Sequence, residues 1–183
     1  PLANPLPTET VVATVDGVPI AQSAWQEAVQ LDAVMSRLAN QPIPSAEETL
    51  DRLVNDILLL RASNLATATV APAEVEARIA SLEAGWGRTD GEIVSALEAA
   101  GLTRQSLANR VAHLILVEQA VNVLSSQYPD LDAWLAQTRQ AAEISLYQPL
   151  DTAGAVAQST AVSTTGAVPS SPVATPTPTL PSP

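Results

Sequence analysis

Two short runs of apolar residues lie near the start of the chain. From about residue 21 onwards, the apolar residues recur at helical spacing instead. The opening runs lie in "VVATVDGVPI", Val11 to Ile20, on either side of Asp16-Gly17. Asp-Gly tolerates the positive φ angles of a type I′ turn, so this stretch predicts a β-hairpin. Pro19 has no N–H to donate, which predicts that the second arm lies at a sheet edge. Because an isolated hairpin is only marginally stable, Val11 to Val15 requires a further strand.

Helical spacing then recurs in about six segments, separated by turn and cap residues. Ser45 with Glu48 matches a capping box, and Pro72 stands where a helix tolerates a missing N–H. The predicted helices are Ala21 to Leu38, one that starts near Ser45, one from Pro72 towards Trp86, one around Ile93 and Leu97, one capped by Thr103 that carries Leu107, Val111, Leu114, Val117, Val121 and Leu124, and one that contains Leu131, Trp134 and Leu135.

A last strand is predicted in "EISLY", directly after the final helix. Ile144 and Leu146 point to one face and Ser145 and Tyr147 to the other, as in a half-buried strand. We expect this strand to pair with Val11 to Val15, so that the two ends of the domain meet. The predicted fold is mainly α, with a small antiparallel sheet formed by an N-terminal hairpin and a C-terminal strand.

Proline-rich stretches bound this domain on both sides. Residues 1–10, "PLANPLPTET", resemble a spacer, residues 11–150 form the helical domain, and residues 151–183 form a tail rich in Ser, Thr and Pro. From Thr152 onwards there is no charged or aromatic residue, which predicts a disordered, extended tail. The chain begins at Pro1 rather than Met, so we expect that an upstream segment, such as an export signal, is missing.

The charge and composition exclude several classes of protein. The formal net charge is −11 and all 8 basic residues are arginines, which opposes binding to nucleic acids and to anionic membrane surfaces. The absence of cysteine excludes a disulfide framework, thiol catalysis and cysteine-based zinc sites. No apolar run approaches the roughly 18 residues of a membrane-spanning helix. No P-loop, EF-hand or dinucleotide-binding motif is present, so no metal or cofactor is expected.

Catalytic residues are also not expected. His113 is the only histidine, and no nucleophile motif such as G-x-S-x-G accompanies it, so a structural role is favoured. The carboxylates Glu47, Glu48 and Asp51 lie near a helix start, where negative charge offsets the helix dipole. Carboxylate pairs that cleave sugars need an aromatic-rich cleft, and aromatic residues make up 3% of this chain.

The order of these segments resembles the N-terminal chaperone domain of SurA and PrsA-type proteins, and the substrate-binding domain of trigger factor is similar in layout. The resemblance rests on "VVATVDGVPI", "ETLDRLVNDILLLRASNL", "VAPAEVEARIASLEAGWG" and "LEAAGLTRQSLANRVAHLILVEQAV". It covers about Val11 to Leu124 and resumes at Leu131 to Tyr147. It implies a chaperone outside the cytoplasm, in the periplasm or at the cell surface, with a lipid anchor upstream as one mode of attachment.

The chain departs from this family after the longest predicted helix. There the resemblance implies a parvulin-type prolyl isomerase domain, but Ser125 to Trp134 are far too few residues to form one. The resemblance therefore implies that the chain binds unfolded or partly folded polypeptides without isomerase activity.

The first predicted helix is the candidate client-binding surface, because its apolar residues spread more widely than contact with one neighbouring helix requires. The flexible thioether of Met35 suits a variable surface, and Trp86, between two glycines at a helix end, is a candidate anchor. For each residue the alternative is an ordinary place in the core. The candidates on this helix are Trp25, Val29, Leu31, Val34, Met35 and Leu38.

Two other functions remain open from the sequence. The domain could be a structural subunit of a cell-envelope assembly, with its apolar surface covered permanently by one protein partner. Alternatively, it could be the binding module of a longer protein that continues beyond Pro183.

Overall fold

The computed structural model describes residues 9–147. Residues 1–8 of the predicted lead and the predicted tail, residues 151–183, lie outside this range. The described part contains six helices and three strands, so the prediction of a mainly α fold with a small sheet is confirmed. The strands are β1 (Val11–Val15), β2 (Val18–Ala21) and β3 (Ile144–Leu146). The helices are α1 (Gln22–Leu38), α2 (Ala46–Ala62), α3 (Pro72–Trp86), α4 (Asp90–Ala99), α5 (Arg104–Ser125) and α6 (Leu131–Ala141).

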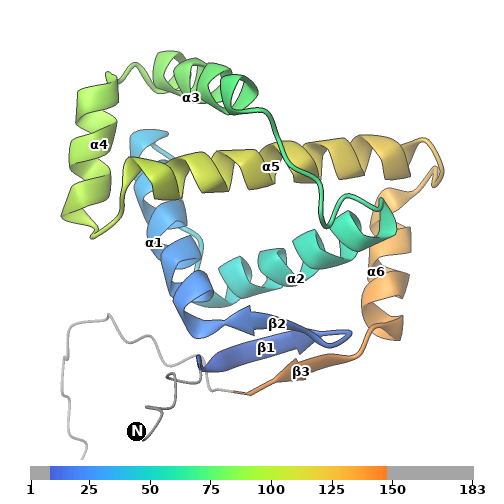
Figure 1. Ribbon diagram of the computed structural model, residues 1–183. Coiled ribbons are helices and arrows are strands. Elements are labelled where there is room, and N and C mark those ends of the chain that lie inside the picture. Colours follow the sequence, from blue (N-terminus) through green and yellow to red (C-terminus); the bar gives the residue numbers. More distant parts are fainter. Residues whose placement is uncertain (1–8, 148–183) are drawn as a thin grey trace, which may run out of the picture. The chain divides into compact units, whose positions relative to one another are not determined.

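The sheet forms as the sequence predicts. Its strand order is β2-β1-β3, and β1 pairs antiparallel with both neighbours. Asp16 and Gly17 have φ angles of 46° and 79°, which are the positive angles of a type I′ turn. The strand that contains Pro19 lies at an edge, and β3 occupies the opposite edge after α6 has returned the chain from the far end of α5 (Figure 1).

Local capping explains where several helices begin and end. Ser45 accepts a hydrogen bond from the backbone N–H of Glu48, whose carboxylate in turn accepts from the N–H of Ser45, which is a complete capping box. Thr103 caps α5 by accepting from the N–H of Ser106, as predicted. The third helix ends at Gly87, whose φ of 63° is the left-handed conformation that favours glycine.

Three apolar clusters hold the helices and the sheet together. The first lies between the C-terminal half of α1, α3, α4 and the first half of α5. The second joins the sheet to the N-terminal half of α1 and to α2. The third lies where the ends of α2 and α5 meet α6. In Figure 1 the sheet and the α3–α4 pair accordingly lie on opposite sides of a frame made by α1, α2 and α5.

Among residues 9–147, no helix combines the length and the apolar character that crossing a membrane requires.

Candidate functional site

The apolar face of α1, which the sequence suggests as an open client-binding surface, is largely core in the structure. Four of the candidate residues on this face are between 3% and 9% exposed: Trp25, Leu31, Val34 and Leu38. Val29 packs beside the second cluster, and Met35 and Trp86 pack beside the first. This burial favours the alternative of an ordinary place in the core for these residues, and the reason is geometric. Because α1 spans two apolar clusters, its apolar residues spread over two sets of neighbours.

Exposing this face of α1 would cost a large share of the free energy that stabilises the fold. Burying an aliphatic side chain contributes about 1.5–3 kcal/mol, so uncovering Leu31, Val34 and Leu38 would cost roughly 5–9 kcal/mol. That is comparable with the whole stability of an ordinary domain, about 5–15 kcal/mol. A binding surface for another polypeptide would therefore have to consist of side chains that are already exposed.

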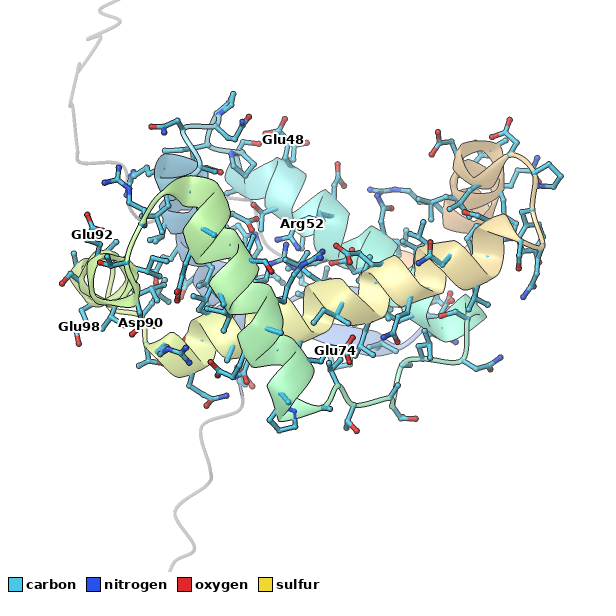
Figure 2. The ribbon with its side chains drawn as sticks, turned by 90° about the horizontal axis from the view of Figure 1, so that it is seen from above. Glu48, Arg52, Glu74, Asp90, Glu92 and Glu98 are labelled. Atoms are coloured by element: carbon cyan, nitrogen blue, oxygen red, sulfur yellow. The ribbon has the colours of Figure 1, made fainter. Side chains whose placement is uncertain are left out.

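A buried group of charged side chains lies between α1, α2 and α5. Arg52 joins two carboxylates, at 2.7 Å from Asp32 Oδ2 and 3.3 Å from Asp56 Oδ2. The hydroxyl of Thr49 also donates to Asp32, at 3.0 Å. Figure 2 shows Arg52 on the inner side of α2, among the helices, whereas Glu48 lies at the exposed start of that helix. These contacts link α1 to α2. The charged side chains Asp32, Arg52 and Asp56, with their neighbours on α5, are called the ionic cluster below.

Two side chains of α5 complete the ionic cluster. Arg110 lies 3.6 Å from Asp32 and 3.9 Å from Asp56, and its Nε and Nη1 atoms have no hydrogen-bond partner among the described residues. Burial lowers the pKa of Arg110, and the nearby Arg52 adds to this effect. His113 Nε2 lies 2.9 Å from Asp56 Oδ2. The cluster therefore fixes three helices against one another through charge as well as packing.

The chemistry available to the ionic cluster is limited. In residues 9–147, the hydrogen bond of the His113 ring joins it to a carboxylate, and no serine or threonine hydroxyl is bonded to it. No group of three His, Asp or Glu side chains within the described range could hold a metal ion. This geometry suits a structural link between helices.

Two hollows of about 280 and 270 Å³ flank Arg110. Pockets that hold small molecules usually measure about 300–1,000 Å³, so these lie just below that range. Charged side chains line both, including Asp32 and Arg52 in one and Glu27 and Arg110 in the other. They suit an apolar client segment poorly.

Among residues 9–147, the large apolar side chains with the highest exposure lie at the end of β3. Leu146 is 64% exposed and Tyr147 is 60% exposed. The backbone N–H of Tyr147 donates to the carbonyl of Val12, which ties this end of the strand to β1. The sequence missed this surface, because the alternation in "EISLY" predicts two strand faces but not which of them a neighbour covers. The other exposed large apolar residues of the described part are Val18, Ile43, Val123 and Tyr128.

The surface charge of the domain is acidic. Ion pairs engage seven of the eight arginines: Arg52, Arg61, Arg78, Arg88, Arg104, Arg110 and Arg139. Many carboxylates remain in excess, in line with the formal net charge of −11. Figure 2 shows three of the acidic residues, Asp90, Glu92 and Glu98, around α4. A bound partner that carries positive charge would be favoured.

Comparison with known proteins gives a distant relative. No model of a known protein family matches the chain. Over 107 residues the chain is 29% identical to a protein of Haemophilus influenzae that is provisionally named peptidyl-prolyl cis-trans isomerase SurA. The aligned region covers 56% of this chain and 31% of that protein, so the chain spans less than a third of its relative. The chain is therefore distantly similar to a SurA-named protein.

Proposed function

We propose that this domain binds unfolded or partly folded polypeptides outside the cytoplasm and keeps them from aggregating, without isomerising prolyl bonds. The segment order resembles the N-terminal chaperone domain of SurA-type proteins. The distant similarity to a SurA-named protein also supports a chaperone-like role. The acidic surface favours solubility of a protein that must expose some apolar area.

One observation carries the proposal: the direct return of the chain from α5 to the sheet. Only residues 126–130 separate α5 from α6, and α6 leads into β3, which pairs with β1. The helical body with its closing strand is the part that the resemblance associates with chaperone activity. At the point where the resemblance places an isomerase domain, this chain has a short connection.

The proposal is tested by aggregation assays with several unrelated unfolded substrates. We expect the purified 183-residue chain to suppress light scattering by most of them at near-equimolar ratio, and to leave the isomerisation rate of a prolyl test peptide unchanged. A clear acceleration of that peptide would refute the absence of isomerase activity.

A fixed envelope assembly predicts a different result. In that case the chain would fail with every unfolded substrate and would co-purify with one partner at fixed stoichiometry. Crosslinking in the native envelope separates the two functions, because a chaperone yields many attached polypeptides and a structural subunit yields one.

A further inference from the structure

We propose that the open edge of β3 binds an extended segment of the client polypeptide as an additional strand of the sheet. The inference rests on the proposed function and specifies where and how the client is held. Strand addition of this kind recognises the main chain, so it can accept many sequences.

Hydrogen bonds establish which backbone groups face outward. The N–H of Asp16 donates to the carbonyl of Glu143 at 2.8 Å, and the N–H of Tyr147 donates to the carbonyl of Val12 at 3.0 Å. Pairing positions in an antiparallel ladder alternate between those that bond to the partner strand and those that do not. Ile144 and Leu146 are therefore the positions whose N–H and C=O groups point away from β1, in agreement with the register.

No strand among residues 9–147 covers this outer edge, since the sheet order ends at β3. The opposite edge is less suitable. It is formed by β2, where Pro19 removes one backbone donor. The two edges of the sheet are thus unequal, and the β3 edge is the better template for another strand.

The side chains at this edge indicate the kind of segment that fits. Leu146 lies opposite the fully buried Ala13, on the face of the sheet that packs on the helices. It is nevertheless 64% exposed, because β3 is the last strand of the sheet among the described residues. An added strand would place alternate side chains next to Leu146, where apolar residues gain most. Its other side chains would lie on the face of Tyr147 and tolerate polar residues.

Charge indicates what should flank that segment. Glu143 precedes β3, and Glu9 precedes the start of β1, at the other end of the paired strands. With the formal net charge of −11, these carboxylates favour lysine or arginine on both sides of the apolar segment. The occupant is therefore an extended, alternating apolar segment with basic flanks. The edge is short, so binding should be weak and readily reversible, as holding a client requires.

Amide hydrogen exchange, measured by NMR on the full chain, tests the geometry. The probe is a short peptide of alternating valine and threonine with lysine at both ends. Without peptide, the Leu146 amide should exchange fast and the Tyr147 amide, which is bonded to Val12, slowly. The peptide should slow exchange at Leu146 several-fold and change Tyr147 little.

A proline variant removes the outward donor without removing a bond to β1. Leu146→Pro lacks the N–H that the added strand would accept from, and Leu146→Ala is the matched control for the loss of the side chain. We expect Leu146→Pro to bind the peptide about fivefold more weakly than Leu146→Ala, the equivalent of one hydrogen bond. If circular dichroism shows that the proline variant is unfolded, a peptide with alternate backbone N-methyl groups makes the same test on the wild-type chain.

The outcomes distinguish this inference from the proposed function. If the wild-type chain holds several unfolded substrates and Leu146→Pro binds peptide as well as Leu146→Ala, the edge is not the binding site although the function stands. If the wild-type chain holds none, the proposed function fails. If the Leu146 amide exchanges slowly without peptide, another segment of the same chain occupies the edge. If the chain forms a dimer that Leu146→Pro abolishes, a second copy of the chain occupies it. Either result overturns the proposal.

Discussion

Leu31 and Leu146 lie at opposite extremes of exposure, at 3% and 64%. Truncating the buried one should leave a cavity in the first apolar cluster, so we expect Leu31→Ala to lower the free energy of unfolding by about 2–5 kcal/mol. The same change at the surface, Leu146→Ala, should alter it by no more than about 0.5 kcal/mol. Denaturant unfolding of both variants measures the difference. Equal, small effects would mean that the α1 face is open after all.

The buried ionic cluster predicts a second contrast, between two aspartates of α2. Removing the carboxylate in Asp56→Ala leaves Arg52 and Arg110 to share the single buried carboxylate of Asp32, so that one positive charge is uncompensated. This should cost about 3–5 kcal/mol of stability. Asp51 pairs with Arg139 at the surface, with 56% of its side chain exposed, so Asp51→Ala should cost at most about 1 kcal/mol. Urea titrations compare the two. A mild effect at Asp56 would show that the cluster contributes little.

The sequence could not predict this cluster. His113 is the lone histidine and was expected to be structural, a role that fits its contact with Asp56. The side chains of the ionic cluster come from three helices, however, and Asp32 and Arg52 are separated by 20 positions. Local spacing shows only that each charge lies on a helix. Which charges become buried together depends on how the helices cross, and that is set by the three apolar clusters.

The end of α3 offers a test of backbone conformation. Gly85 lies within the helix and Gly87 has a φ of 63°, and an added Cβ would meet no atom within 4 Å at either position. Gly85→Ala should therefore raise the free energy of unfolding by about 0.5–1 kcal/mol. Gly87→Ala should lower it by about 1–2 kcal/mol, because the left-handed conformation is strained for alanine. Effects of the same sign, measured by chemical denaturation, would contradict the assigned helix end.

The capping box of Ser45 and Glu48, and a second one that Thr89 and Glu92 form at the start of α4, predict how stability depends on pH. Hydrogen bonds from the Ser45 backbone and hydroxyl lower the pKa of Glu48 from its ordinary value of 4.5, and Thr89 does the same for Glu92. A lowered pKa in the folded state contributes stability that is complete above pH 4.5 and is lost as the pH falls through the folded-state value. Replacing both residues with glutamine should therefore lower the melting temperature at neutral pH.

The difference in melting temperature between this double variant and the wild type should become smaller as the pH falls below 4.5. Glutamine keeps the shape and can still accept the backbone hydrogen bond, so it isolates the charge. Thermal unfolding followed by circular dichroism across this range makes the comparison. A difference that stays constant with pH would rule out ionisation of the two glutamates as its cause.

Elements defined by local chemistry could be predicted well. The hairpin, the box at Ser45 and the cap at Thr103 follow from neighbouring residues alone. The apolar spacing of α5 does not by itself show which of its residues are buried. Of the apolar residues that define the helix in the sequence, Leu107, Val111 and Leu124 are buried, and the structure adds Ile115 and Ala120. Because α5 contacts one apolar cluster with its first half and another with its second, its buried stripe shifts along the helix.

The closure of the domain was predictable because only one distant segment had a strand pattern. The pairing of β1 with β3 brings together residues from both ends of the domain. The exposure of the apolar residues on α1 was not predictable, since their spacing suits a core and an open face equally well. Exposure depends on what lies next to each element. The structure supplies that information for α1, which is covered, and for the β3 edge, which is uncovered within the described residues.

The most direct test of the proposed holding function compares one polypeptide in its unfolded and native forms. A protein that has been reduced and carboxymethylated stays unfolded, and its binding to the full chain can be followed by fluorescence anisotropy. We expect saturable binding of the unfolded form, weaker at high salt because acidic groups contribute, and no binding of the native form. Equal binding of the two forms, or binding of neither, would contradict the proposed function.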